Sequence, residues 1–185
     1  MKHCHQFGSF CIEISKARLS LLVIKTPNLL ITQKISGFEK IPQEGGALIV
    51  YYHASIPIDY FGLVTRTYLE KGRLIRSVMD RNLIMMPGAE VLIRTFGAMP
   101  GGREDVIKLL KEGHLVGVAP GGGYEAQLAG KDYPVMWKLR RGFAVVAKEA
   151  GVPIIPMFTE NVREAYVNME SGNGLRRSIK RTELI

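Results

Sequence analysis

The apolar positions of this chain form two alternating kinds of pattern. One kind is a short, mostly apolar run, which is typical of a strand buried within a sheet. Four such runs occur, at residues 47–52, 73–79, 115–119 and 152–159. The first of them, ALIVYY, follows the turn-forming sequence QEGG. These runs predict four strands.

The second kind of pattern predicts helices between the strands. Three segments combine helical spacing of apolar residues with a glycine at the end, at 58–72, 103–113 and 141–151. The segment REDVIKLLKEG at 103–113 begins with two acidic residues near the end where the helix dipole favours them. The strand–helix alternation indicates an α/β layered fold with a largely parallel central sheet flanked by helices.

One domain accounts for the patterned part of the chain. We assign residues 36–166 to this domain, and the 185-residue chain is long enough to bury a core. Residues 1–35 have no clear periodicity and are left unassigned, while residues 167–185 form a basic C-terminal tail.

In α/β folds with a parallel sheet, functional residues lie at the carboxyl ends of the strands. In this sequence those ends are followed by His53, by the glycines 121–123 and by Pro156 onward.

The charge of the chain narrows the class of partner. Lysine and arginine number 25 against 17 aspartate and glutamate, so the net charge is +8. This excess favours a negatively charged partner: nucleic acid, anionic lipid headgroups or a phosphate-bearing substrate. No apolar run approaches the roughly 18 residues that would span a bilayer. Cys4 and Cys11 give no disulfide framework, which favours a reducing compartment, on or near the cytoplasm.

His53 and Asp59, in the stretch YYHASIPIDYFG, are a candidate catalytic pair. Six positions on one continuous helix would turn them to different faces, so they meet only if the chain turns and a helix begins near Pro57. A histidine oriented by a carboxylate can take a proton from a hydroxyl, with the carboxylate fixing the tautomer. The alternative is that Asp59 interacts with free N–H groups of a helix start and His53 merely ends a strand. Spacing alone leaves both interpretations open.

The glycine-rich segment VAPGGGYEAQLAG at 118–130 admits three interpretations. Consecutive glycines after a strand let backbone N–H groups approach an oxyanion or a phosphate. Gly121, Gly123 and Ala126 also fit the G-x-G-x-x-A spacing of dinucleotide-binding proteins, although the supporting acidic residue about 20 positions further on is missing. A plain tight turn is the third interpretation.

Other candidate ligands are weaker. Arg103, at a predicted helix start, could hold an anion through paired hydrogen bonds or could be an exposed charge, and Arg94 is a weaker case of the same kind. The sequence HCHQ at 3–6 has no partner cluster, so we expect no metal site. No CxxC pair, HExxH or GxSxG motif occurs, which gives no support to a zinc or serine hydrolase.

Taken in order, four blocks resemble the glycerolipid acyltransferase family, also called the phospholipid/glycerol acyltransferase superfamily. The blocks are YYHASIPIDYF, PGGRED, GHLVGVAPGGGYEA and WKLRRGFAVVAKEAGVPIIPMFTENVREAY, within residues 36–166. The resemblance is greatest to the diacylglycerol-acyltransferase-like branch and, within it, to the transmembrane protein 68 group. That group also has five residues between the histidine and the aspartate, an HX5D motif.

The resemblance implies a role for each block. His53 would activate the acceptor hydroxyl for attack on an acyl-CoA thioester, with Asp59 as its partner and no covalent acyl-enzyme. Gly121, Gly122 and Glu125 would shape the acceptor and acyl-CoA pocket, and Arg103 would contact a substrate phosphate. Val152, Pro153 and Pro156 match the last block, which is mainly architectural. Arg140 and Arg141 would meet CoA phosphates or lie on a solvated helix start.

The resemblance also implies a setting. We expect acyl-CoA as co-substrate with no cofactor, a glycerolipid acceptor and a membrane surface as partners, and no nucleic acid. The expected location is the endoplasmic reticulum membrane, with the domain facing the cytoplasm, and the oligomeric state is left open. Tyr124 departs from the arginine of the relatives, and neither anchoring helices nor the relatives' further C-terminal elements are visible. The alternatives are therefore a shortened, catalytically incomplete form that binds lipid or a partner, and a nucleotide-binding α/β protein.

Overall fold

The computed structural model of the chain describes residues 35–85, 87–88, 96–130 and 132–165. Within these residues five strands form one sheet in which every pairing is parallel, in the order β3-β2-β4-β1-β5. The strands are β1 (Ala47–Tyr51), β2 (Ile75–Met79), β3 (Met99–Pro100), β4 (Leu115–Val118) and β5 (Ile154–Met157). The prediction of an α/β fold with a parallel sheet is confirmed.

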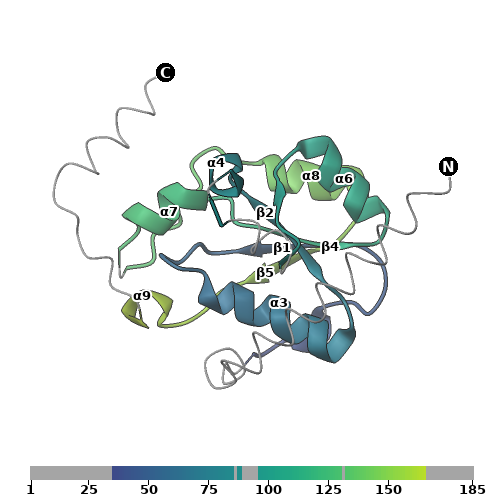
Figure 1. Cartoon of the computed structure of the whole chain (residues 1–185), viewed down its shortest axis with the longest axis horizontal. Helices are drawn as coiled ribbons and strands as arrows, with labels where there is room; N and C mark the ends of the chain where they lie inside the picture. The colour runs from purple at the N-terminus through teal and green to yellow at the C-terminus, as the bar shows by residue number, and fades with distance from the viewer. Residues whose placement is uncertain (1–34, 86, 89–95, 131, 166–185) are drawn as a thin grey trace.

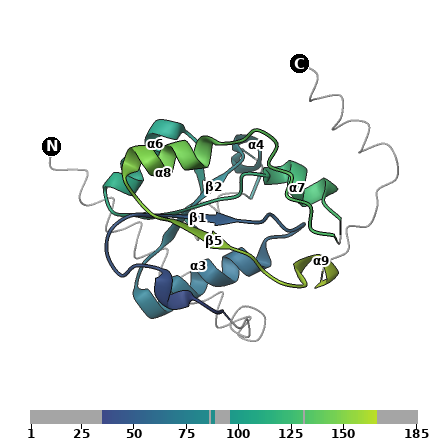
Figure 2. The same cartoon turned by 180° about the vertical axis from the view of Figure 1, so that it is seen from behind.

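Helices cover both faces of the sheet. They are η1 (Phe38–Lys40, a 3-10 helix), α3 (Ile58–Lys71), α4 (Arg81–Ile84), α6 (Arg103–Lys111), α7 (Gly122–Leu128), α8 (Gly142–Ala150) and α9 (Val162–Ala165). Helix α3 lies on one face, and α6 and α8 lie side by side on the other (Figure 1). Seen from behind, β5 runs along the edge of the sheet and continues toward α9 (Figure 2).

The alternation of side chains along β1 explains the two layers. Ile49 and Tyr51 pack in the core that α3 closes, whereas Leu48 and Val50 pack in the core beneath α6 and α8. Successive residues of a strand point to opposite faces, so a sheet covered on both sides needs a continuous apolar run. The unbroken run at 47–52 reflects this double burial.

Gly117 lets α3 approach the sheet closely. The ring of the fully buried Tyr60, on α3, lies against this glycine, where an added Cβ would be 2.1 Å from the phenol oxygen. The Tyr60 hydroxyl shares a 2.8 Å hydrogen bond with Ser77 Oγ on β2. The absence of a side chain at position 117 therefore allows one residue of α3 to tie the helix to the sheet.

The four predicted strands and three predicted helices are confirmed, but η1, β3, α4, α7 and α9 do not follow from the sequence analysis. Strand β3 has two residues, too few for a pattern. Helix α7 begins at Gly122, so the glycine segment leads directly into a helix and is more than a tight turn. Glycine has a low helix propensity, which hides this helix from the sequence.

Several expectations lie outside the described residues. These are the ones on the N-terminal segment 1–34, including the HCHQ sequence, on Arg94, and on the basic tail 167–185. Within the described part of the chain, no helix has both the length and the apolarity needed to cross a bilayer.

Candidate active site

The carboxyl ends of β1, β4 and β5 lie at one edge of the sheet, because the strands are parallel. His53 follows β1, the glycines 121–123 follow β4, and Thr159 follows β5. Asp59 lies in the first turn of α3, which begins after β1. Helices α7 and α9 lie at the same end of the molecule (Figure 1). The sheet therefore brings together residues that are far apart in the sequence.

The tautomer of His53 follows from one hydrogen bond. Its Nδ1 lies 2.6 Å from the carbonyl oxygen of Ala54. Since a carbonyl can only accept, Nδ1 carries the hydrogen, which leaves the Nε2 lone pair available to take a proton. Burial lowers the pKa of His53, and the bond to Ala54 and the charges of Glu125 and Asp59 oppose this shift. The imidazole is therefore neutral at pH 7 and suited to act as a base.

Asp59 is buried, with 5% of its surface exposed, although it carries a carboxylate. Burial raises its pKa, while a hydrogen bond with Thr159, the N–H groups of Tyr60 and of Asp59 itself, and the charge of His53 act in the opposite direction. Its Oδ1 has no hydrogen-bond partner among the described residues. The carboxylate thus interacts both with the helix start and, through its charge, with His53, while the ring of His53 bonds to Ala54. The expectation that Asp59 fixes the tautomer of His53 is wrong in this structure, because the ring bonds to the carbonyl of Ala54 and only the charge of Asp59 acts on it.

A cavity of about 640 Å³ opens beside Asp59. Its walls include the apolar side chains Ile41, Ile49, Leu63, Ile155 and Met157, and Asp59 and Thr159 contribute polar groups. This volume lies within the range of about 300–1,000 Å³ found for small-molecule sites. Polar and apolar groups line it in similar measure, because Ser36, Glu160 and Asn161 also belong to its walls. A cavity of this kind beside Asp59 can hold a ligand that has both apolar and polar parts.

Glu125, on α7, is fully buried at 0% exposure, and both carboxylate oxygens accept from backbone groups. Its Oε2 accepts from the N–H of His53 at 2.9 Å, and its Oε1 accepts from the N–H of Met136 at 3.1 Å. The side chain folds over Gly121, where an added Cβ would lie 2.4 Å from the Cβ of Glu125. Glycine at 121 therefore makes room for a carboxylate of the protein itself, and the nucleotide hypothesis gains no support from this contact.

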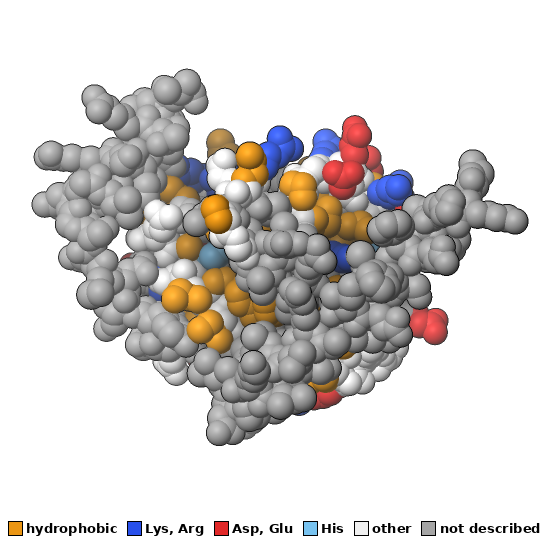
Figure 3. All heavy atoms as spheres, in the orientation of Figure 1, with side chains coloured by type: hydrophobic (Ala, Val, Ile, Leu, Met, Phe, Trp, Pro, Cys, Tyr) orange, Lys and Arg blue, Asp and Glu red, His pale blue; other side chains and the backbone are white. Residues whose placement is uncertain are grey.

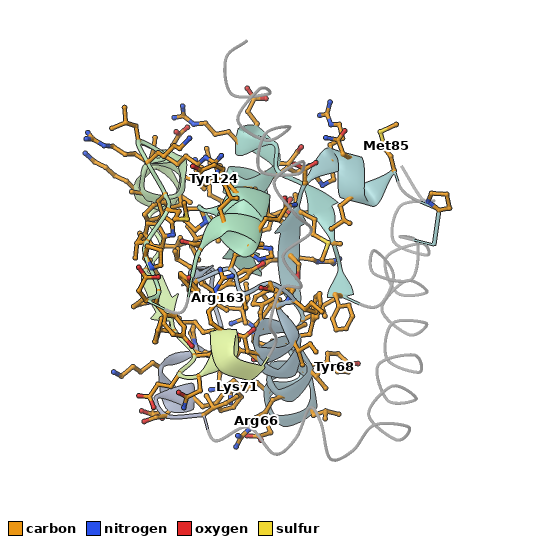
Figure 4. The ribbon with its side chains drawn as sticks, turned by 90° about the vertical axis from the view of Figure 1, so that its left-hand side faces the viewer. Arg66, Tyr68, Lys71, Met85, Tyr124 and Arg163 are labelled. Atoms are coloured by element: carbon orange, nitrogen blue, oxygen red, sulfur yellow. The ribbon has the colours of Figure 1, made fainter. Side chains whose placement is uncertain are left out.

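Arg163, on α9, is 4% exposed and reaches back to the end of β1. Its guanidinium donates to the carbonyl of His53 at 2.8 Å and lies over the ring of Tyr52, 5.1 Å from its centre. Figure 4 shows Arg163 between α7 and α9. Sequence reasoning gave Arg163 no role. The only signal for it is its position in the last block of the family resemblance.

The remaining candidates lie around this centre with different partners. Arg103 is 60% exposed and forms a 2.6 Å ion pair with Glu149 of α8. Gly122 adopts a positive φ of 51° at the start of α7. Arg140 donates to the carbonyl oxygens of Pro120 and Gly121, both at 2.9 Å, and so holds the glycine segment. Substrate binding by Arg103, Gly121, Gly122 and Glu125 stays a prediction. No group of three or more potential metal ligands occurs within the described residues.

An α/β domain with a histidine–aspartate motif after its first strand, a glycine segment after another and a cavity beside the aspartate fits the acyltransferase class. The model of the Acyltransferase family matches residues 33–160. The chain belongs to this family. The resemblance seen in its sequence is confirmed.

Several named proteins are similar to this chain in sequence. The chain is 44% identical over 133 residues to a human protein named "DGAT1/2-independent enzyme synthesizing storage lipids", with 72% of this chain and 41% of the relative covered. It is 45% identical to the mouse protein of that name, covering 72% and 40%. An Arabidopsis thaliana protein, "Phytyl ester synthase 1, chloroplastic", is 24% identical over 68% of this chain and 19% of its own length. The chain thus spans about two fifths of its mammalian relatives. No solved structure matches it.

Proposed function

We propose that the chain transfers a fatty acyl group from acyl-CoA to a hydroxyl group of a glycerolipid, with His53 as the general base. The observation that carries the proposal is the tautomer of His53, whose Nδ1 is bonded to Ala54 while Nε2 is left to accept a proton. A base of this kind is what attack by a hydroxyl requires. The relatives named for the synthesis of storage lipids support a lipid acceptor.

The reaction needs one base and no covalent intermediate on the protein. Nε2 of His53 takes the proton of the acceptor hydroxyl as its oxygen attacks the thioester carbonyl. The tetrahedral intermediate then collapses, the carbon–sulfur bond breaks, and the CoA sulfur leaves as it takes the proton back from the imidazolium. The products are an ester and free CoA. The charge of Asp59 stabilises the imidazolium, as its effect on the pKa of His53 indicates.

The cavity at Asp59 is the proposed place of the acyl chain. Its apolar side chains, among them Ile41, Leu63 and Met157, would remove part of a hydrocarbon chain from water, which is favourable at about 0.8 kcal/mol for each buried CH₂ group. Asp59 lines the same cavity, so the reactive end of a bound acyl group would lie near the motif. The roles proposed for His53 and Asp59 in the reaction do not depend on placing the acyl chain in this cavity.

The edge of the sheet that carries His53 is the proposed membrane-facing surface. Exposed apolar side chains follow the carboxyl ends of several strands: Ile56, Met85, Val135, Leu139 and Phe158. Met85 projects outward from the end of α4 (Figure 4). Figure 3 views a different side of the molecule, where hydrophobic side chains lie over the middle and charged ones along the upper rim. Apolar groups together with the +8 net charge favour an anionic bilayer surface.

The test is acyl transfer from labelled acyl-CoA to a panel of glycerolipid acceptors by the full chain and by His53→Ala. We expect the variant to lose at least about 100-fold in turnover, which is the contribution typical of a general base. A variant as active as the parent chain would exclude the mechanism.

A second candidate is a lipid-binding domain without turnover, which the cavity alone favours because its walls do not include His53. In that case a fluorescent fatty acyl ligand would bind equally to the parent chain and to His53→Ala, and neither would form an ester. Turnover by the parent chain would exclude this candidate.

A further inference from the structure

We propose that Arg163 is a positioning residue for His53 and that, with Glu125, it clamps the backbone of His53 from both sides. The carboxylate of Glu125 accepts from the N–H of His53 at 2.9 Å, and the guanidinium of Arg163 donates to the C=O of the same residue at 2.8 Å. Both polar groups of one backbone residue are thus bonded to buried charged side chains. The contacts of the clamp do not depend on the proposed function. Only their purpose, which is to orient a catalytic base, rests on it.

The hydrogen bonds of Arg163 match the donors of a guanidinium one for one. A guanidinium has five N–H donors: one on Nε and two on each Nη. The five acceptors are Tyr52 Oη (3.2 Å) for Nε, Ser55 Oγ (3.2 Å) and Ala126 O (3.0 Å) for Nη1, and His53 O (2.8 Å) and Glu125 O (2.6 Å) for Nη2. A lysine has three donors on one atom and no fork, so it cannot reproduce this pattern.

The acceptors of Arg163 come from two segments that the fold must hold in register. Three belong to the segment 52–55 after β1, and two are carbonyl oxygens of α7. Glu125 contributes two acceptors: its carboxylate accepts from the N–H of His53, and its backbone carbonyl accepts from Arg163. Arg163 therefore fixes the distance between α7 and the histidine.

The ring of His53 has little freedom once its backbone is held. The bond from Nδ1 to Ala54 fixes the tautomer, and that carbonyl lies next to the clamped peptide groups. If the clamp loosens, the ring loses both its direction and its Nδ1 partner. A misplacement of about 1 Å at a reacting group can lower the rate by about 100-fold.

The test compares Arg163→Lys with a matched control, Arg73→Lys. Arg73 also donates to three carbonyl oxygens, of Pro42, Gly45 and Gly113, but it lies at the opposite, amino edge of the sheet. Both variants keep the charge and lose the fork. We expect Arg163→Lys to lower kcat by 10- to 100-fold with KM within about twofold, while Arg73→Lys leaves both unchanged.

A second measurement separates positioning from stability and does not require turnover. The chain has four histidines, so the ¹⁵N signals of His53 can be assigned by their loss in His53→Gln. In the parent chain we expect the Nδ1–H tautomer, and in Arg163→Lys a mixture of both tautomers, with Arg73→Lys like the parent. If Arg163→Lys fails to fold, Glu125→Gln tests the other side of the clamp by the same signals.

The outcomes distinguish the two proposals. Unchanged tautomer signals in a folded Arg163→Lys or Glu125→Gln would overturn the clamp, whatever happens to the rate. If the tautomer signals are altered in the variant and the parent chain forms no ester with any acceptor, the clamp is supported and the proposed function is overturned. Altered signals together with a lower kcat support both.

Discussion

Substituting the neighbouring glycines 121 and 123 by alanine is expected to have opposite effects on stability. At Gly121 the new Cβ would lie 2.4 Å from both Cβ and Cδ of Glu125, whereas at Gly123 nothing lies within 4 Å. Gly121 has an ordinary φ of −71°, so any loss in its variant comes from the contact and not from the backbone. The pair isolates the role of the Glu125 side chain.

The magnitude follows from what must move. Overpacking a tight site costs about 1–3 kcal/mol. Displacing the Glu125 carboxylate leaves the N–H of His53 or Met136 without its acceptor, which costs about 1–3 kcal/mol for each buried group. Gly121→Ala should therefore lose about 2–6 kcal/mol from a domain whose total is about 5–15 kcal/mol. Gly123→Ala, inside α7, should gain about 0.5–1 kcal/mol because alanine favours a helix.

Urea unfolding followed through the single tryptophan, Trp137, measures both variants. With a slope of about 2 kcal/mol per molar urea, Gly121→Ala should unfold at a midpoint about 1–3 M lower than the parent chain. Gly123→Ala should unfold at the same or a slightly higher midpoint. A Gly121→Ala midpoint equal to that of Gly123→Ala would refute the reasoning, because it would mean that Glu125 adapts without loss.

Two further predictions concern Asp59 and the cavity. The charge of Asp59 raises the pKa of His53 and burial raises the pKa of Asp59 itself, so Asp59→Asn should move the midpoint of the pH–rate profile, which rises with pH, to lower pH. Asp59→Asn should also raise the urea midpoint of unfolding at pH 7, because a raised carboxyl pKa means that the ionised form destabilises the folded state. A pH–rate profile that moves to higher pH would contradict the first of these two expectations. Leu63→Trp, which narrows the cavity, should shorten the longest acyl chain that is accepted, whereas Leu69→Trp, on the exposed side of the same helix, should not. Equal chain-length profiles, measured with acyl-CoA of increasing length, would remove the acyl chain from this cavity.

Sequence reasoning succeeded where a pattern repeats over several residues. The unbroken run at 47–52 predicted a strand covered on both faces, and the helix at 103–113 could be found from its acids and its apolar stripe. These signals are local, and burial on a sheet or helix face has a period that the sequence displays directly.

The site depends on contacts that have no local signal. A glutamate is expected on the surface, yet Glu125 is buried because two N–H groups and the space above Gly121 accommodate it. The partner of His53 Nδ1 is a backbone carbonyl, which no spacing of side chains can reveal. Arg163 is 110 residues from His53 in the sequence, so only the completed fold shows that they meet.

That separation has a consequence for the order of folding. The contacts that hold His53 span 72 residues to Glu125 and 110 residues to Arg163, and closing such long loops is slow compared with forming local helices. During synthesis, residue 53 emerges well before residue 163, so the histidine is made early but its backbone is held last. A nascent chain that stops short of α9 can contain β1, α3 and the whole histidine–aspartate motif and still lack an aimed base. If His53 is the base that we propose, it would be aimed only after α9 has docked, and the partly made domain would not yet be active.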